Sequence, residues 1–472
     1  MALHDWLIST PEAQGVDSQK LLDLLDYARA QRLNLHSLLI ARSGRLVLEA
    51  YFHPYHTDSQ HDMRSIAKSV TALLVGIALH EGKLTSLDQP VLSFFPKRTV
   101  AHRDVRKEAM TLRHLLNMSS GLALTDADTW HCLTEADALQ WALDAPVETE
   151  PGAQMVYSSA NYYLLSAVLQ QATGQTLADY AQTKLFAPLG IGEVRWQSSQ
   201  QGITLGWGGL WLASRDLAKL GALILADGQW NSVQLVPKAW IDTISRTQAE
   251  NTNYGFGCWL DAERGAVILS GYGGQFCCLL PGCDLVLVLT AGLRDPSSIL
   301  NHLMDTFVCP ALHLNSLPEN PEVAAELVAR AAGLGRPQSR SLPPLPALAV
   351  QISGQRWQLD QNGLGLTAFT LTVQGSLLSL TLEAGEDRAV IPLAMDSVLR
   401  DVLVERLGGM ADHDRMAAVG GWREGRTLVM HWYSINNPEY WGVAITFEGQ
   451  QAVLRWEDVL SGYGETVTAR QA

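Results

Sequence analysis

A serine and a lysine three positions apart stand out in the stretch HDMRSIAKSV, residues 61–70. Ser65 and Lys68 come directly before residues 70–79, which are apolar apart from Thr71 and predict a helix buried on every face. Three positions are about one helical turn, so the hydroxyl and the amine are expected on the same side of the helix start. Because an ammonium group near a dry core must be paired or lose its proton, Lys68 needs a partner or a function.

Two interpretations of this pair compete. Ser65 could cap the helix, although a capping box has Glu or Gln three residues later, and the charge of Lys68 opposes the helix dipole. Alternatively, the helix N-terminus and apolar surroundings favour a neutral Lys68 that takes the proton of Ser65, while N-terminal amides stabilise an oxyanion. The pattern favours this second interpretation, acyl transfer through Ser65, and the cap stays an alternative.

Two further stretches could complete such a site. A leaving group needs a second proton donor, and Tyr157 and Ser159 stand at the start of another apolar helix, in PGAQMVYSSANYYLL. Such a tyrosine could also be a packed aromatic. Residues 270–275, SGYGGQ, form either a hairpin turn or a place where backbone approaches a ligand. In the second case the amide of Gln275 would join that of Ser65 as an oxyanion donor.

The surrounding pattern predicts helices between two groups of strands. Residues 17–31 read as a helix with Asp17 at its N-cap, and residues 35–52 as a hairpin turning at Ser43-Gly44. The remaining elements are helices over most of 111–190, a helix from about Ser214, a β meander over 254–292 and a helix over 296–308. Strands from both ends of this region predict one antiparallel sheet and an α+β fold.

A second domain is predicted beyond a Pro-rich stretch. Residues 335–346, GRPQSRSLPPLP, are typical of a linker. The pattern then changes to β alternation, which indicates an all-β barrel or sandwich. The predicted organisation is 1–318 for the first domain, 319–346 for a helix and linker, and 347–472 for the β domain. No motif assigns chemistry to that β domain, which could cover the cleft, mediate dimerisation or stabilise the chain.

Composition narrows the classes of partner. The 472 residues are 47% hydrophobic and 17% charged with a net charge of −14, and no Lys/Arg cluster occurs, which argues against nucleic acid and anionic membranes. The longest apolar runs are shorter than the ~20 residues of a membrane span. The first residues lack a secretory-signal pattern, so a cytoplasmic location is expected. The six cysteines lack CxxC spacing and are expected to be reduced thiols.

The sequence argues against two other hydrolase classes. No Gly-x-Ser-x-Gly surrounds any serine, which disfavours an α/β-hydrolase triad. The stretch FHPYHTDSQHD could supply metal ligands, but it is expected to be a polar loop rather than a rigid site, so neither metal nor cofactor is predicted. Its potential ligands are His53, His56, Asp58, His61 and Asp62.

Three short motifs together resemble one family. They are Ser65-Ile-Ala-Lys68, Tyr157-Ser-Ser159 and Tyr272-Gly-Gly274, in that order. This ordered set resembles the serine β-lactamase and penicillin-binding-protein-like hydrolases, especially the class C β-lactamase-related branch. HEGKLTSLDQPV, MTLRHLLNMSSGL and GGLWLASRDLAKLG also look like that family, and the resemblance covers about residues 10–310. It implies a β-lactamase-like antiparallel sheet flanked by helices, a helical subdomain and a cleft between them.

The resemblance also implies roles for individual residues. Ser65 would be the acylated nucleophile, Lys68 its general base and Tyr157 the proton shuttle to the leaving group. At two positions this chain departs from the family β-lactamases, which have Asn where it has Ser159 and Lys where it has Tyr272. That Lys gives the β-lactam carboxylate a cationic partner, whereas Tyr272 offers a neutral hydroxyl. Efficient penicillin hydrolysis is therefore not expected.

These variants are similar to those of carboxylesterase and 6-aminohexanoate-dimer hydrolase members of the branch. The prediction is an esterase or amidase acting on a small molecule, with Ser159, Tyr272, Gly274 and Gln275 binding the substrate. A true β-lactamase or D-Ala peptidase, and a non-catalytic binding protein on the same fold, stay as alternatives. Homo-oligomerisation is left open.

Overall fold

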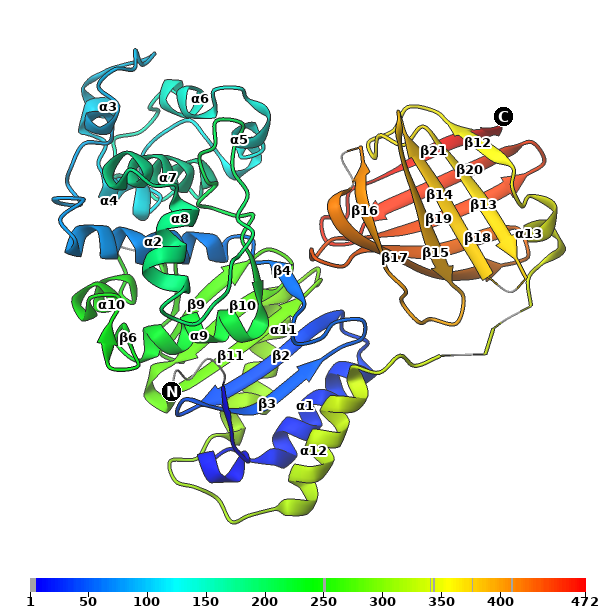
Figure 1. Cartoon of the computed structure of the whole chain (residues 1–472), viewed down its shortest axis with the longest axis horizontal. Helices are drawn as coiled ribbons and strands as arrows, with labels where there is room; N and C mark the ends of the chain where they lie inside the picture. Colours follow the sequence, from blue (N-terminus) through cyan, green and yellow to red (C-terminus); the bar gives the residue numbers. More distant parts are fainter. Residues whose placement is uncertain (1–5, 249–251, 340, 343, 376, 409–410) are drawn as a thin grey trace.

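The computed structural model describes residues 6–248, 252–339, 341–342, 344–375, 377–408 and 411–472. Residues 1–5, 340 and 343, which belong to the N-terminal and linker segments discussed above, lie outside the described residues. Figure 1 shows a helical subdomain above a sheet with helices on both faces, and a barrel connected by a long extended segment.

A seven-stranded sheet forms the centre of the first domain, in the order β1-β3-β2-β11-β10-β9-β8. Its strands are β1 (Leu7–Ile8), β2 (Leu35–Arg42), β3 (Arg45–Tyr51), β8 (Trp259–Asp261), β9 (Ala266–Gly271), β10 (Gln275–Leu280) and β11 (Leu285–Ala291). All neighbours pair antiparallel except β1 and β3. The early hairpin and the late meander therefore join at β2 and β11, which confirms the predicted α+β sheet from distant segments.

Helices bury both faces of this sheet, and β2 shows how. Leu38 and Ile40 pack into the core beside α1 (Ser18–Ala30), α11 (Pro296–Leu303) and α12 (Pro321–Leu334). Leu39 and Ala41 pack into the opposite core, beside α2 (Ile66–His80) and α9 (Ser214–Leu225). The alternation follows from the two-residue period of a strand. Because both faces are covered, every residue of β2 is buried, and residues 38–41 are a continuous apolar run rather than an alternating one.

The predicted helix starts agree with the structure. Asp17 is the N-cap of α1 and accepts a hydrogen bond from the Gln19 N–H. The helix expected near Ser214 begins there as α9. Residues 296–308 start with α11 and continue as a π-helical turn from Met304 to Val308.

A helical subdomain packs around α2, which is buried along most of its length. Its helices are α3 (Val105–Ala109), α4 (Leu112–Leu116), α5 (His131–Thr134), α6 (Ala138–Asp144), α7 (Ser159–Thr173) and α8 (Leu177–Ala181), with α10 (Lys238–Ile244) below. Two small sheets lie outside the central one, β4 (Gln60–Asp62) with β5 (Trp211–Ala213) and β6 (Gln229–Trp230) with β7 (Val233–Gln234). Within the described ranges, no helix combines the length and hydropathy that a bilayer crossing requires.

The C-terminal domain is a closed barrel rather than a sandwich. After α13 (Ala347–Gln351) come β12 (Arg356–Leu359), β13 (Ala368–Gln374), β14 (Leu377–Ala384), β15 (Asp387–Ala394), β16 (Val402–Leu407), β17 (Ala411–Arg423), β18 (Thr427–Ser434), β19 (Tyr440–Glu448), β20 (Gln451–Asp458) and β21 (Gly464–Gln471). Nine of them close through a parallel pairing of β15 with β17, and β16 adds to β17 outside the ring. Its centre is filled by large side chains, among them Trp357, Phe369 and Trp432. This confirms the all-β prediction.

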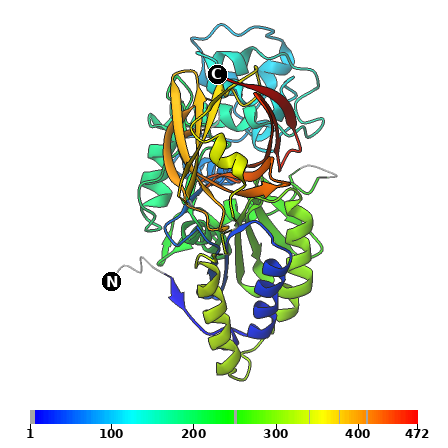
Figure 2. The same cartoon turned by 90° about the vertical axis from the view of Figure 1, so that its right-hand side faces the viewer.

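The barrel contacts the first domain through the turn between β18 and β19. Figure 2 shows the barrel in front of the region where the helical subdomain meets the sheet. The Asp62 N–H donates to Asn436 O over 2.8 Å, and Tyr55 packs with Ala417 and Ile435. In the segment 319–346, α12 contributes Leu327 and Ala331 to the core beneath the sheet. The two domains therefore meet directly as well as through the linker.

Candidate active site

Ser65 and Lys68 are in hydrogen-bond contact at the start of α2. Lys68 Nζ donates to Ser65 Oγ over 2.9 Å and to Trp207 O over 3.3 Å. Lys68 is 1% exposed, and Ser65, although at the N-cap position, makes no side-chain capping bond. The serine hydroxyl is therefore engaged with the amine, and the capping alternative is wrong.

Aromatic rings and tight backbone enclose the lysine. Its Nζ lies 4.9 Å from the ring centre of Tyr157 and 5.9 Å from that of Trp207. A Cβ on Gly257, whose φ is 75°, would lie 2.8 Å from Lys68 O. Glycine is needed there because the chain packs directly on the first turn of α2. The amine is thus held in a dry position where its polar contacts count for more than in water.

The backbone before Ser65 makes a sharp elbow. Arg64 has a φ of 51°, in the left-handed region that non-glycine residues seldom adopt. Its N–H donates to Asp62 Oδ1 over 2.9 Å, and the Ile66 N–H donates to Met63 O over 3.1 Å. Among the described residues the Ser65 N–H has no acceptor. This N–H can therefore donate to an oxyanion formed beside Ser65.

Tyr157 lies beside the same cavity as Ser65. The cavity measures about 260 Å³ and also includes Trp259, whose ring stacks on Tyr157 at 6.1 Å between centres. Ser159 begins α7 just behind it and donates from Oγ to Asp126 Oδ1 over 2.5 Å. The predicted tyrosine thus faces the cavity, while the serine at the third motif position holds a carboxylate at its edge.

The turn between β9 and β10 forms another wall. Gly271, Tyr272 and Gly273 line the cavity, and Tyr272 is 49% exposed. A Cβ on Gly271 would lie 2.3 Å from Met63 O, so this strand end approaches the nucleophile elbow as closely as backbones allow. The segment is a hairpin turn between β9 and β10. It also forms part of the cavity wall.

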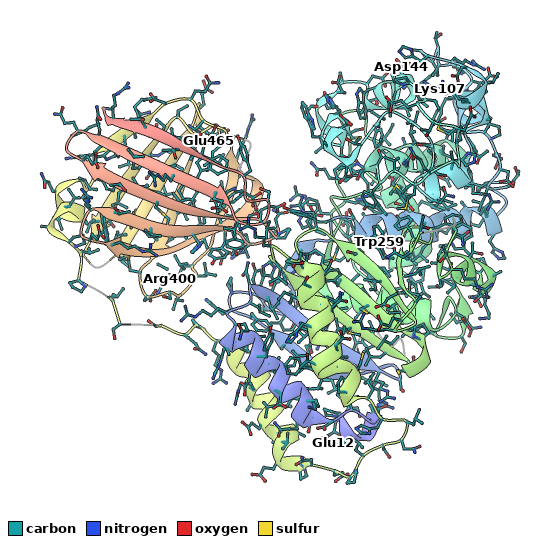
Figure 3. The ribbon with its side chains drawn as sticks, turned by 180° about the vertical axis from the view of Figure 1, so that it is seen from behind. Glu12, Lys107, Asp144, Trp259, Arg400 and Glu465 are labelled. Carbon is teal, nitrogen blue, oxygen red and sulfur yellow. The ribbon has the colours of Figure 1, made fainter. Side chains whose placement is uncertain are left out.

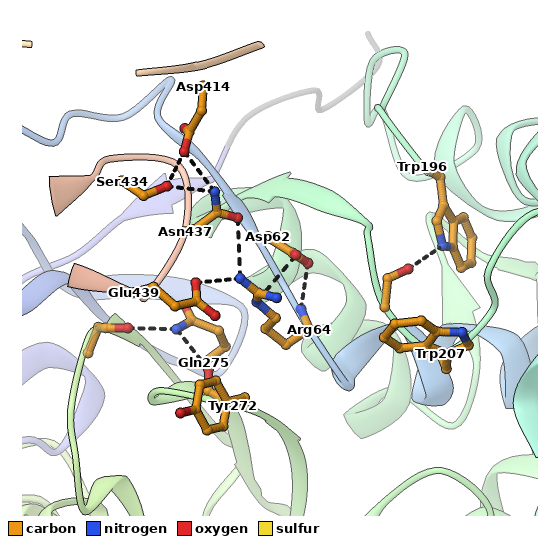
Figure 4. Close-up of polar contacts among 12 residues, drawn as sticks. Asp62, Arg64, Trp196, Trp207, Tyr272, Gln275, Asp414, Ser434, Asn437 and Glu439 are labelled. Atoms are coloured by element: carbon orange, nitrogen blue, oxygen red, sulfur yellow. Dashed lines mark hydrogen bonds and ion pairs between the residues drawn. The ribbon is translucent and has the colours of Figure 1, made fainter. Parts of the chain in front are cut away.

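Gln275 and Gly274 lie behind this wall. Gln275 Nε2 donates to Ala291 O over 2.7 Å and to Tyr272 O over 3.4 Å (Figure 4). A Cβ on Gly274, whose φ is 100°, would lie 3.2 Å from the Ala291 side chain. Both residues brace the turn from inside the sheet. Of the predicted site residues, Ser65, Tyr157 and Tyr272 line the cavity itself, with Lys68 directly beneath it.

Residues that sequence reasoning did not select also line the cavity, among them Asp126, Trp259, Arg294 and Leu460. Asp126 comes from the segment before α5, and Leu460 from the barrel. Their positions depend on long-range packing, so no local motif indicates them. The position of Arg294 could have been suspected from the sequence, because it comes just after β11. That strand pairs with β10, which follows the glycine-rich turn.

Three of the five potential metal ligands have their side chains engaged elsewhere. His53 Nε2 lies 3.1 Å from Leu399 O, and Asp62 pairs with Arg64. His61 stacks against His36 with 5.1 Å between ring centres. In the part of the chain that the structure describes, no group of three or more His, Cys, Asp or Glu residues is arranged to hold a metal ion.

Comparisons with known proteins agree with this architecture. Penicillin-binding protein 4* of Bacillus subtilis is 27% identical over 150 residues, 30% of this chain and 32% of that protein. The 6-aminohexanoate-dimer hydrolase of Paenarthrobacter ureafaciens is 23% identical over 56% of this chain and 74% of its own length. The chain thus spans about a third of one relative and three quarters of the other.

A solved structure extends the likeness to the barrel. The octameric penicillin-binding protein homologue from Pyrococcus abyssi covers 96% of this chain and 100% of its own, with a TM-score of 0.52 and 17% identity. It therefore shares the fold of both domains. The Beta-lactamase family model matches residues 35–298, more than half of the 472 residues. This chain belongs to the Beta-lactamase family.

Proposed function

We propose that this chain is a serine hydrolase that forms an acyl-enzyme on Ser65, with Lys68 as general base and Tyr157 as proton shuttle. Its proposed substrates are small esters or amides. The observation that carries the proposal is the 2.9 Å contact between Lys68 Nζ and Ser65 Oγ, in surroundings that leave Lys68 1% exposed. A base within this distance of a hydroxyl can accept its proton.

The proposed reaction has two halves. Ser65 Oγ attacks the substrate carbonyl carbon while its proton passes to Lys68 Nζ, and the carbonyl oxygen becomes an oxyanion. The backbone N–H groups of Ser65 and Gln275 are the proposed donors to that oxyanion. The intermediate then expels the alcohol or amine, which takes a proton through Tyr157 O–H as Lys68 returns its own. In the second half, water attacks the acyl carbonyl, its proton returns Ser65 to a hydroxyl, and the carboxylic acid leaves.

The cavity supports a small substrate. Its volume of about 260 Å³ is below the range of drug-sized pockets. Tyr157, Trp259 and Tyr272 give it aromatic walls. We propose that Tyr272 contacts the substrate, that Ser159 shapes one edge by holding Asp126, and that Gly274 and Gln275 fix the turn opposite Ser65.

A second candidate rests on Arg294. Its side chain lines the cavity and is 66% exposed, so a substrate carboxylate could pair with the guanidinium. That role would resemble the one that a lysine plays in family β-lactamases at the position of Tyr272. A D-alanyl peptidase or β-lactamase is therefore the alternative function.

A substrate panel tests both candidates. Nitrophenyl esters, short-chain amides and nitrocefin are assayed on the wild type and on Ser65→Ala, and a fluorophosphonate label is located by mass spectrometry. We expect ester or amide turnover that Ser65→Ala abolishes, with label on Ser65. Nitrocefin turnover as fast as the best ester would favour the second candidate. An unlabelled wild type would indicate a binding protein, and activity lost to EDTA and restored by zinc would indicate a metallohydrolase.

Domain boundaries and assembly are further parts of the proposal. We propose a hydrolase domain over 1–318, a connecting segment over 319–346 and a barrel domain over 347–472. The octameric homologue makes a homo-oligomer the expectation for this chain. Light scattering coupled to gel filtration measures the mass directly, and a mass equal to one 51.6 kDa chain would contradict it.

A further inference from the structure

The barrel reaches the residue next to the nucleophile. The turn 435–439 between β18 and β19 carries Glu439, whose Oε2 accepts a hydrogen bond from Arg64 Nη2 over 2.5 Å. Asn437 Oδ1 accepts a second bond from the same Nη2 over 3.4 Å (Figure 4). The side chains of Arg64 and Glu439 are 28% and 22% exposed, so this is a largely buried ion pair between the two domains.

The same turn also contacts the elbow through its backbone. Asn436 O accepts from the Asp62 N–H over 2.8 Å. The Asp62 carboxylate in turn accepts from the Arg64 N–H over 2.9 Å and lies 3.3 Å from Arg64 Nε. Arg64, in its left-handed conformation, is thus held between a carboxylate of its own domain and one of the barrel. Such conformations persist where the surroundings over-determine them.

The turn is rigid in its own right. Within the barrel, the Asp414 carboxylate accepts from Asn437 Nδ2 over 3.0 Å and from Ser434 Oγ. Asn437 Nδ2 also lies within 2.8 Å of Ser434 Oγ. These contacts fix the amide so that its oxygen faces Arg64 (Figure 4). The barrel therefore presents a preorganised surface to the elbow rather than a flexible loop.

The turn covers the opposite wall of the cavity as well. A Cβ on Gly273 would lie 2.4 Å from Pro438 Cβ and 3.2 Å from Leu460 Cδ1. Gly292, at the end of β11, lies equally close, since a Cβ there would be 2.4 Å from Pro438 O. One barrel turn therefore touches the elbow that carries Ser65 and the glycine turn across the cavity from it.

We propose that Glu439 and Arg64 form a positioning pair, through which the barrel holds residues 62–65 in the conformation that presents Ser65 for acylation. The proposal rests on the proposed function, because Ser65 acylation is its readout. It assigns to the C-terminal domain a direct part in the hydrolase site. Neither residue transfers a proton or touches the reacting atoms; both act through the backbone of Ser65.

The test compares two barrel carboxylates in the full-length chain. Glu439→Gln keeps the size of the side chain and removes its charge. The matched control is Glu457→Gln, because Glu457 also pairs across the domain contact, with Arg294 over 3.9 Å, but both partners are more than half exposed, at 53% and 66%. The measured quantity is the second-order rate of fluorophosphonate labelling at Ser65, with kcat and KM for the best ester alongside.

We expect Glu439→Gln to slow labelling and lower kcat roughly ten- to a hundredfold with KM within about twofold, since small misplacements of reacting groups have effects of this size. The control should stay within about twofold of the wild type. Arg64→Gln should slow labelling at least as much, and the double variant should be no slower than Arg64→Gln alone, because both changes break the same ion pair.

Two results would overturn the proposal, and they differ. If the wild type carries no label on Ser65, the proposed function fails and this inference fails with it. If the wild type is labelled and Glu439→Gln reacts as fast as Glu457→Gln, the positioning role alone is refuted. Should Glu439→Gln fail to fold, Arg64→Gln replaces it, since it removes the other partner of the same ion pair. An unchanged labelling rate in a folded Arg64→Gln would count against the proposal, and a slower one for it.

Discussion

Among the described residues, two lysines are at most 1% exposed, and their partners differ. Lys107, 0% exposed, donates from Nζ to Ala101 O and Leu143 O, each over 2.8 Å. Burial lowers its pKa, and the Asp144 carboxylate opposes that change. Figure 3 shows Lys107 beside Asp144 in the helical subdomain. Lys68, 1% exposed, contacts the Ser65 hydroxyl, one carbonyl and two aromatic rings.

The difference shows that burial alone does not identify a catalytic lysine. Carbonyl oxygens can accept hydrogen bonds but have no proton to give, whereas the Ser65 hydroxyl can exchange one with Lys68. Spacing alone is equally insufficient. Lys219 stands three residues after Asp216 in α9, as Lys68 does after Ser65, and forms an ion pair with it over 2.9 Å. The group that contacts the lysine Nζ, rather than burial or spacing, therefore indicates whether the lysine can act as a base.

The largest expected effect comes from removing the Lys68 amine. Lys68→Met keeps an unbranched side chain in the apolar site and deletes the proposed base. We expect the kcat/KM for the best ester to fall by roughly 10²- to 10⁴-fold, the usual worth of a general base. The free energy of unfolding should fall by less than in Lys107→Met, because Lys68 donates to one carbonyl over 3.3 Å whereas Lys107 donates to two over 2.8 Å. Activity within tenfold of the wild type would break the distinction between the two lysines.

Tyr157 sharpens the comparison, since its ring faces Lys68 and no ring contact of this kind is found for Lys107 among the described residues. Tyr157→Phe keeps the ring and removes the hydroxyl. We expect a loss of roughly 10²-fold in kcat, at the lower end for proton transfer, because water can replace a lost hydroxyl. The loss should be greater for amides than for nitrophenyl esters, whose leaving groups depart without a proton. Equal losses on both substrates would contradict the shuttle role.

Contacts between residues close together in the sequence could be predicted, and contacts between distant residues could not. Ser65 and Lys68 are one turn apart, so their spacing and the apolar run after them indicated the contact. The sheet was predicted because strand alternation and turn glycines are local. Arg64, directly before Ser65, could not be interpreted, because its partner Glu439 lies 375 positions away in another domain. Asp126 and Leu460 were missed for the same physical reason.

The same limit applies to the substrate-binding residues. The glycines of 270–275 predicted close backbone approach, and Gly271 shows it against Met63 O. Sequence could not tell which of these residues face the cavity, because a tight turn directs its side chains by its own dihedral angles. Tyr272 points into the cavity, while Gln275 turns inward to Ala291 O. The barrel was predicted as all-β from alternation, but its closure depends on the pairing of β15 with β17, which no local pattern encodes.

Lys107→Met tests whether Lys107 contributes to stability and not to activity. The variant leaves Ala101 O and Leu143 O without their buried donor, and each unsatisfied buried acceptor costs about 1–3 kcal/mol of stability. We expect that loss in the free energy of unfolding, measured with urea, and ester hydrolysis within about twofold of the wild type. Lys68→Met is the matched control with the opposite pattern. A tenfold loss of activity in a folded Lys107→Met would show that the two lysines are not separate in function.

The smallest expected effect concerns two buried histidines, His36 and His61. Like the buried lysines, they are bases whose protonation depends on burial. Burial lowers the pKa of His61 from 6.5 to about 3, and burial together with the neighbouring His61 lowers that of His36. Between pH 6.5 and the lowered values the unfolded chain binds protons that the folded chain does not, so the free energy of unfolding falls as the pH falls. Each histidine should contribute about 1.4 kcal/mol per pH unit in that window. Urea unfolding at pH 6.5 and 5.5 should therefore show a smaller pH dependence in His61→Gln than in the wild type. Equal slopes would mean that His61 takes up its proton in the folded state, and that burial at this site does not hold a base neutral.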